Sequence, residues 1–341
     1  AHGGVAVIGR VSPADRDRDL VGHVLKLPSA IAQQPALGGQ RVAPRNDTPT
    51  RKALLTFVDR VTLADSPDYV PPHQRIAVFD NDGTLWVEKP LYIHLYGVLA
   101  QMKSQMGGDP FLHTREPYRS LAEKDKTYFL ELYENAAFDS LAGQIFGVPF
   151  GGYSAQQYSD WFRTFLKDFK HPELGVGVEG LVYQPMLELI RYLEANDFKI
   201  YIFTADEGDF LRLVSEKLYG IPPEQVHGTS VRSEFVIENE EPMLVRSYRV
   251  QHFNNWDGKP RLIQSVIGRK PLFAVGNSNG DQHMLQYAAL SGGMSVLIRH
   301  TDGEREFSYD SHTDKVMPLA KAEGWIVVDM KGDWERVFPD E

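Results

Sequence analysis

Five short apolar runs, separated by segments of helical or polar spacing, constrain the fold of this chain more than any other feature. A strand buried on both faces reads as a continuous apolar run, and such strands alternating with helices pair into a parallel sheet. We therefore expect an α/β fold with a doubly wound, mostly parallel sheet. The five runs are residues 76–79, 199–203, 272–275, 295–298 and 325–328.

The segment between the first two runs has a different character. It is mostly helical in spacing and rich in aromatic residues, which predicts an inserted helical cap domain over residues 86–185. Residues 51–85 and 186–341 then form the α/β core. Residues 1–50, rich in Gly, Pro, Gln and Arg, are typical of a peripheral arm or loop.

Individual elements can also be predicted. The cap pattern contains helices at residues 91–106, 127–138 and 158–169, and the core pattern contains helices at 51–61, 186–196 and 209–220. Thr48 or Thr50 is a suitable N-cap for the first core helix. The stretch EFVIENEEPMLVRS predicts a hairpin that turns at residues 239–241.

Composition excludes several classes of protein. The 341 residues include 46 acidic and 36 basic side chains, for a formal net charge of -10, so we expect no nucleic-acid partner. The chain contains no cysteine, which rules out disulfides, thiolate metal sites and a cysteine nucleophile. A metal ion must therefore be held by oxygen or imidazole.

Charged residues interrupt every apolar run well before the ~18–20 residues of a bilayer span, so we expect no transmembrane segment. The sequence begins at Ala1 rather than Met, which fits a processed secretory product or a trimmed chain. Together with the absence of cysteine, this slightly favours a periplasmic or secreted protein over a cytoplasmic one.

Polar side chains follow three of the predicted strands. Asp80 and Asp82 come directly after the first strand, Thr204 follows the second, and Asn277 and Asp281 follow a later one. The carboxyl ends of parallel strands form the ligand-binding edge of an open sheet, so we expect these residues to lie together. Lys259 precedes the later strand, in the sequence DGKPRL.

Two carboxylates two residues apart can share one Mg²⁺ and still do different chemistry. Asp80 suits a nucleophile for phosphorus, provided that Mg²⁺ and a lysine ammonium screen the charge of the substrate. Asp82 can protonate the leaving oxygen and later deprotonate the attacking water. Backbone N–H groups from Asn81 onwards, with a sharp turn at Gly83, can point at phosphate oxygens, and Thr204 offers a further hydroxyl donor.

These motifs resemble those of the haloacid dehalogenase superfamily, within it the phosphoserine-phosphatase-like hydrolases. AVFDNDGTLW is similar to the first motif, YIFTAD to the second, Lys259 to the third and FAVGNSNGD to the fourth. The resemblance covers roughly residues 52–341 and implies an α/β core with a helical cap.

The resemblance also implies a role for each motif residue. Asp80 would form an aspartyl-phosphate intermediate, and Asp82 would act as general acid and base. Thr204 and Lys259, with Asn81 and Ala205 beside the motif residues, would bind the phosphoryl group. The resemblance implies Mg²⁺ as cofactor, with these ligands: Asp80, Asp281, the backbone carbonyl of Asp82, and Asn277.

The sequence departs from the family pattern at two places. Asn277 stands where the fourth motif usually has Asp, which predicts a weaker metal site. Asp206 and Glu207 follow Ala205 where glycines are common, and we expect them to cap the next helix rather than bind a cationic part of the substrate. Glu88, at the hinge to the cap, fits a solvated position better than a substrate contact.

The sequence therefore predicts a Mg²⁺-dependent phosphatase that acts on a small phosphomonoester. A phosphomutase and a non-catalytic phospho-ligand binding protein remain alternatives, whereas Asp82 argues against a dehalogenase. The leaving group and the oligomeric state stay open.

Overall fold

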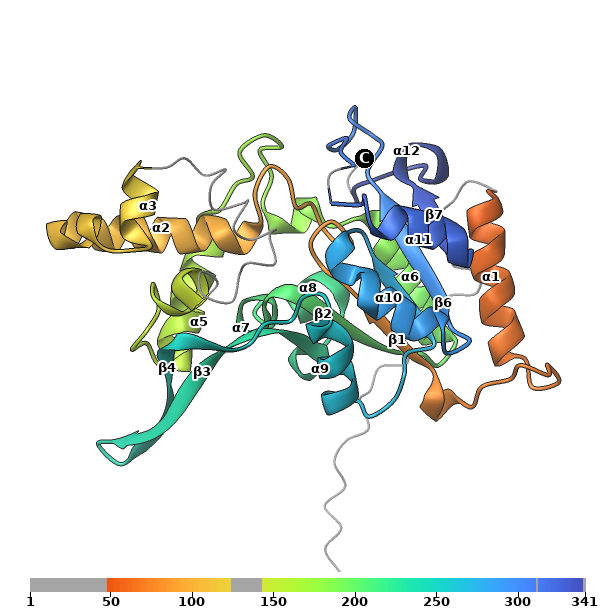
Figure 1. Ribbon diagram of the computed structural model, residues 1–341, viewed down its shortest axis with the longest axis horizontal. Helices are drawn as coiled ribbons and strands as arrows, with labels where there is room; N and C mark the ends of the chain where they lie inside the picture. Colours follow the sequence, from red (N-terminus) through yellow and green to blue (C-terminus); the bar gives the residue numbers. More distant parts are fainter. Residues whose placement is uncertain (1–47, 124–142, 311, 340–341) are drawn as a thin grey trace, which may run out of the picture. The chain divides into compact units, whose positions relative to one another are not determined.

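The computed structural model describes residues 48–123, 143–310 and 312–339. In this part of the chain, seven strands form one sheet in the order β4-β3-β2-β1-β5-β6-β7 (Figure 1). All neighbouring strands are parallel except β3 and β4, which form a hairpin at one edge. The predicted doubly wound, mostly parallel sheet is therefore confirmed. The strands are β1 (Ile76–Phe79), β2 (Lys199–Glu207), β3 (Val226–Glu238), β4 (Glu241–His252), β5 (Phe273–Gly276), β6 (Met294–Arg299) and β7 (Ile326–Asp329).

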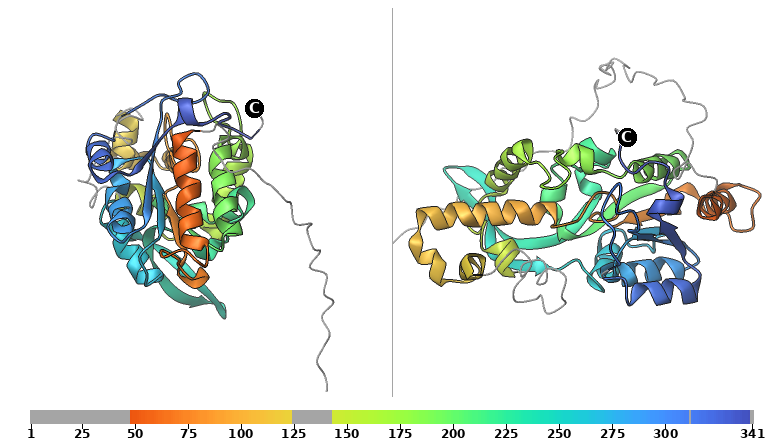
Figure 2. Two further views of the ribbon diagram at one scale, coloured as in Figure 1. Left: turned by 90° about the vertical axis from the view of Figure 1, so that its right-hand side faces the viewer. Right: turned by 90° about the horizontal axis from the view of Figure 1, so that it is seen from above.

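Alternate side chains of the strands point to opposite faces of the sheet, and each face is covered by helices. In β1, Ala77 and Phe79 pack into one apolar cluster, and Ile76 and Val78 pack into the other. Figure 2 shows the two helical layers, with α1 and α6 on one side and α10 and α11 on the other. The core helices are α1 (Pro49–Thr62), α6 (Gln184–Ala195), α7 (Gly208–Leu211), α8 (Ser215–Tyr219), α9 (Gly258–Val266), α10 (Gln282–Ala289), α11 (Val316–Glu323) and α12 (Met330–Asp333).

The segment between β1 and α6 is helical, as expected. Its α-helices in the described residues are α2 (Ile93–Gly108), α3 (Tyr118–Glu123) and α5 (Ala155–Asp168). Their apolar side chains belong to the same cluster as one face of the sheet, so the insertion and the core share one continuous interior. The β3–β4 hairpin also contacts the insertion, because Arg246 exchanges backbone hydrogen bonds with Gly152 and Tyr153.

Most predicted elements occur where expected, with two corrections. Thr48 caps α1, and the hairpin turns between Glu238 and Glu241. The helix predicted at 209–220 is wrong as one element, because α7 and α8 are separated by a turn. Arg212 holds this turn against β3 by donating from Nε to the Val226 carbonyl over 3.0 Å. Strand β2 continues to Glu207, four residues beyond the predicted end.

Other predictions stay untested. The helix at 127–138 and residues 1–47 of the predicted arm lie outside the described residues. The boundaries of the core and cap domains remain predictions. None of the helices in the described part of the chain combines the length and the apolar character that crossing a membrane needs.

Gly228, near the start of β3, allows a close backbone contact that positions the end of β2. A Cβ atom at this position would lie 2.5 Å from the Asp206 carbonyl oxygen and 2.6 Å from the Gly208 nitrogen. Backbone atoms cannot rotate away from such an overlap. We expect Gly228→Ala to lower the free energy of unfolding by about 2–3 kcal/mol, measured by urea denaturation. Gly107→Ala is the control, because a Cβ there meets nothing within 4 Å, and an equal loss in both variants would contradict the prediction.

Candidate active site

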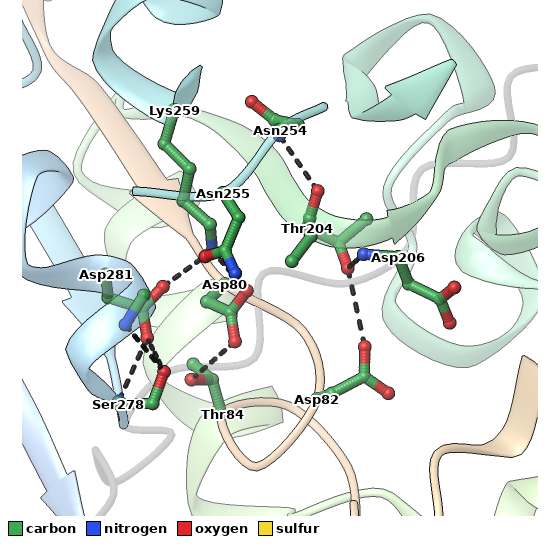
Figure 3. A network of polar contacts seen from close by, with 12 residues as sticks. Asp80, Asp82, Thr84, Thr204, Asp206, Asn254, Asn255, Lys259, Ser278 and Asp281 are labelled. Carbon is green, nitrogen blue, oxygen red and sulfur yellow. Dashed lines mark hydrogen bonds and ion pairs between the residues drawn. The ribbon is translucent and has the colours of Figure 1, made fainter. Parts of the chain in front are cut away.

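The chemistry-bearing residues lie at the carboxyl ends of the three central strands. β1 lies between β2 and β5, where the chain order of the sheet reverses, and this is where open α/β sheets bind ligands. Asp80 follows β1, Asn277 follows β5, and Thr204 lies where the pairing of β2 with β3 becomes irregular. Lys259 reaches the same place from α9, as Figure 3 shows.

The ammonium group of Lys259 joins two carboxylates. Its Nζ lies 2.5 Å from Asp80 Oδ1 and 2.6 Å from Asp281 Oδ1. The Lys259 side chain is only 1 % exposed, so water contributes little to this contact. The first, third and fourth motifs therefore meet at one buried cation.

Burial raises the pKa of Asp80 to about 7. The negative charge of Asp281 adds to this rise, whereas the Lys259 ammonium opposes it. Burial alone would lower the pKa of Lys259, but Asp281 and Asp80 outweigh it and raise that pKa above its ordinary value. Lys259 therefore remains charged, and Asp80 ionises near neutral pH.

A short turn after β5 fixes Asp281. The turn η7 (Asn279–Asp281) brings Asp281 Oδ2 within 3.0 Å of the backbone N–H groups of Asn277 and Ser278. These N–H groups donate to one carboxylate oxygen, and Lys259 donates to the other. The orientation of Asp281 is thus set by hydrogen bonds on both oxygens.

Asp82 has different surroundings from Asp80. Trp86 Nε1 donates to Asp82 Oδ1 over 2.8 Å, and the Thr204 hydroxyl donates to Oδ2 over 3.4 Å. Burial, followed by the charges of Asp206 and Asp80, raises the pKa of Asp82 well above its ordinary value. These surroundings therefore favour the protonated form of Asp82.

The remaining predicted phosphate-binding positions are near, but they face different ways. The Asn81 side-chain oxygen accepts a hydrogen bond from Tyr219 over 3.0 Å, so it is occupied within the protein. Ala205 lines the pocket between the strand ends. Thr204 is fully buried, and its hydroxyl also accepts the N–H of Asp206.

Glu88 is not a solvated hinge residue, and this interpretation was wrong. It is 6 % exposed and lines the same pocket as Asp80 and Asp82. Glu88 Oε1 accepts hydrogen bonds from Tyr309 over 2.7 Å and from Asn277 Nδ2 over 3.1 Å. Asn277 Oδ1 accepts from Thr84 over 3.2 Å, so the side chain of Asn277 bridges two neighbours. Its role as a metal ligand stays a prediction.

The helix-cap interpretation of Asp206 and Glu207 is also wrong. Glu207 precedes α7, but its side chain makes no capping hydrogen bond. Instead it pairs with buried Arg246 and accepts a hydrogen bond from Tyr158 over 2.9 Å. Asp206 lies 2.6 Å from His94 Nδ1. These partners come from β4, α5 and α2, too far along the chain for local sequence patterns to reveal them.

Several pocket residues were also missed from the sequence. Trp256 precedes Lys259 by three residues, and this short separation is the one signal that could have found it. Ser278, Asn279 and Gly280 lie within the fourth motif, whereas Tyr92, Asn255 and His312 belong to no motif. The complete lining is Asp80, Asp82, Glu88, Tyr92, Ala205, Asn255, Trp256, Lys259, Ser278, Asn279, Gly280, Asp281 and His312.

The chemistry of the pocket fits a hard divalent cation. Four buried carboxyl groups and the Lys259 ammonium line the pocket. When all four are ionised, the pocket has more negative than positive charge. The four are Asp80, Asp82, Glu88 and Asp281. Carboxylate oxygens are the donors that Mg²⁺ prefers. Among the described residues, however, no three His, Asp or Glu side chains already converge as a metal cluster.

Solved structures share this architecture at low sequence identity. A conserved protein of unknown function from Anaerococcus prevotii DSM 20548 is 15% identical, covers 81% of this chain and 90% of its own, and has a TM-score of 0.51. A protein of unknown function from Bordetella pertussis Tohama I is 15% identical over 75% of this chain and 99% of its own, with a TM-score of 0.48. A phosphoserine phosphohydrolase-like protein from Francisella tularensis subsp. tularensis SCHU S4 is 14% identical over 74% of this chain and 94% of its own, with a TM-score of 0.40.

No family model and no curated protein matches the chain. The similarity to the A. prevotii protein therefore shows a common fold and nothing more. The mostly parallel α/β sheet that the four sequence motifs imply is present in this chain. The first, second and fourth motifs lie at the carboxyl ends of β1, β2 and β5, and the third motif lies at the start of α9.

The raised pKa of Asp80 predicts that this residue costs stability. The folded protein holds the Asp80 proton up to about pH 7, whereas the unfolded chain releases it near pH ~4. The stability that the folded protein gains by retaining this proton is therefore present below pH ~4 and is lost as the pH rises through 7. At pH ~8 without divalent cations, we expect Asp80→Asn to raise the free energy of unfolding by about 1–3 kcal/mol. Urea denaturation measures this change.

The control is Asp65→Asn, at an exposed position after α1, which should leave the unfolding free energy unchanged within ~0.5 kcal/mol. A native chain that is more stable than the Asp80→Asn variant at pH ~8 would show that the Lys259 contact outweighs the burial of the charge.

Proposed function

We propose that this protein is a Mg²⁺-dependent phosphatase that hydrolyses a small phosphomonoester through an aspartyl-phosphate on Asp80. The observation that carries the proposal is the buried arrangement around Lys259. The Asp80 carboxylate lies 2.5 Å from the Lys259 ammonium, whereas the carboxylate of Asp82, two residues further along the chain, accepts a hydrogen bond from Trp86. This separation gives the two acids different protonation, as nucleophilic and acid catalysis require.

In the first step, an Asp80 carboxylate oxygen attacks phosphorus, and the bond from phosphorus to the ester oxygen breaks. Asp82 donates its proton to that leaving oxygen. Its raised pKa favours the protonated form that this step needs. In the second step, ionised Asp82 takes a proton from water, the water oxygen attacks phosphorus, and the aspartyl-phosphate releases inorganic phosphate and free Asp80.

The charge of the phosphoryl group must be screened throughout. The Lys259 ammonium and the Thr204 hydroxyl lie at the site and would contact phosphoryl oxygens, with backbone N–H groups near Asn81 and Ala205. Asp80, Asp281 and the backbone carbonyl of Asp82 would hold the metal ion, and Asn277 would support it. When bound, Mg²⁺ would neutralise phosphoryl charge and favour ionised Asp80.

A phosphate-release screen tests this proposal. The substrates are amino-acid, sugar and choline-like phosphomonoesters together with a nonspecific aryl phosphate, each with Mg²⁺ and with a chelator. We expect Mg²⁺-dependent phosphate release from at least one ester, and loss of release with the chelator. Asp80→Asn should lower kcat by at least ~10³-fold, because the amide is a poor nucleophile.

The exposed Asp65→Asn variant serves again as the control and should retain native turnover. Full activity in folded Asp80→Asn would refute Asp80 as the nucleophile. Isomerisation of a sugar phosphate without free phosphate would indicate a phosphomutase. Tight ligand binding without turnover at millimolar Mg²⁺ would indicate a binding protein.

A further inference from the structure

His300 and Glu306 are buried and, with half-buried Tyr309, lie against the loop that carries Asp80 and Asp82. His300 comes directly after β6 and is 3 % exposed. The proposed chemistry uses neither this histidine nor the residues up to Tyr309. Their side chains nevertheless reach the loop after β1 at two points.

The first contact is with the backbone of Gly83. The His300 Nε2 atom lies 2.8 Å from the Gly83 carbonyl oxygen, and Nδ1 lies 3.2 Å from Glu306 Oε2. Tyr183 donates to the other Glu306 oxygen over 2.8 Å. A carbonyl can only accept hydrogen bonds, so Nε2 of His300 must be the donor to Gly83.

The orientation of the Gly83 carbonyl affects the position of the next residue in the loop, Thr84. Gly83 adopts φ 72°, and its N–H donates to the Trp86 carbonyl over 2.8 Å. Fixing the Gly83 carbonyl also fixes the peptide plane that leads to Thr84. The Thr84 hydroxyl shares its one proton between Asp80 Oδ2 at 3.4 Å and Asn277 Oδ1 at 3.2 Å. One hydrogen bond from His300 therefore constrains a side chain that touches the nucleophile.

The second contact is made by Tyr309. Its ring stacks on the His300 ring with centroids 4.3 Å apart and planes inclined by 16°. The Tyr309 hydroxyl donates to Glu88 Oε1 over 2.7 Å, and the Lys89 ammonium lies 4.9 Å from the ring centroid. The His300 ring is thus held between a stacked aromatic ring and a carboxylate, with little room to rotate.

We propose that His300, held between the Gly83 carbonyl and Glu306, is a positioning residue that orients the loop carrying Asp80 and Asp82. The effect on turnover rests on the proposed phosphatase function, but the orientation of the loop does not. The titratable groups from neighbouring elements that face His300 and Glu306 are Tyr183, Tyr309, Glu88, Lys89 and His171.

Two substitutions at His300 separate positioning from general stability. Glutamine can place an N–H close to the position of Nε2 and still donate to Gly83, whereas leucine cannot. We expect His300→Leu to lower kcat about 10–100-fold with KM within ~3-fold of native, because small displacements of reacting groups cost this much. His300→Gln should recover kcat to within ~3-fold of native.

His171→Leu is the matched control. His171 is also buried, and its Nε2 also lies 2.8 Å from a backbone carbonyl, that of Lys89. In His171→Leu we expect the melting temperature to fall about as much as in His300→Leu, while kcat stays within ~2-fold of native. An equal loss of kcat in both leucine variants, or no rescue by glutamine, would overturn the positioning role.

Amide hydrogen exchange tests the loop without any substrate. The N–H groups of Thr84 and Leu85 donate to the Asn81 carbonyl, so their exchange reports whether the loop keeps its shape. We expect faster exchange at these amides in His300→Leu than in native protein and in His300→Gln. Unchanged exchange in folded His300→Leu would overturn the proposal, even if the protein proves to have another activity.

Discussion

The contact on which the candidate site depends is the buried ammonium of Lys259 between Asp80 and Asp281. Burying three charges together is costly unless each is paired and hydrogen-bonded. Asp281 meets this condition through two backbone N–H groups, whereas Asp80 is supported by the Asn81 backbone and by the Thr84 hydroxyl at 3.4 Å. The raised pKa of Asp80 reflects its burial and then the negative charge of Asp281. In the proposed mechanism, a metal ion or a phosphoryl group would approach on the Asp80 side.

The sheet explains why these groups meet. β1 lies between β2 and β5 and pairs with both in parallel, so residues after all three strands emerge at one edge. Because β1 and β5 are only four residues long, the polar residues begin as soon as the apolar core ends. Sequence could predict this edge, because a continuous apolar run followed by Asp or Asn has few other structural explanations.

The partners of those residues could not be predicted in the same way. Glu207 is satisfied by Arg246 from β4 and Tyr158 from α5, and Glu88 by Tyr309 beyond β6. Such pairs depend on how the insertion and the hairpin pack against the core, which leaves no local spacing in the sequence. The hinge and helix-cap interpretations failed for this reason, since both judged an acidic side chain from its neighbours along the chain alone.

Asp80 and Asp82, two acids separated by one residue, have different surroundings. The carboxyl of Asp80 faces an ammonium, which favours its charged form, whereas Asp82 faces an indole N–H, a hydroxyl and the negative charge of Asp206. Burial raises both pKa values, but only Asp80 has a cation to oppose the rise. A nucleophile must be ionised and a general acid must be protonated at the same pH. The proposed mechanism therefore relies on Lys259 to favour ionised Asp80 and on the charge of Asp206 to favour protonated Asp82, which gives Asp206 a role where relatives tend to have glycine.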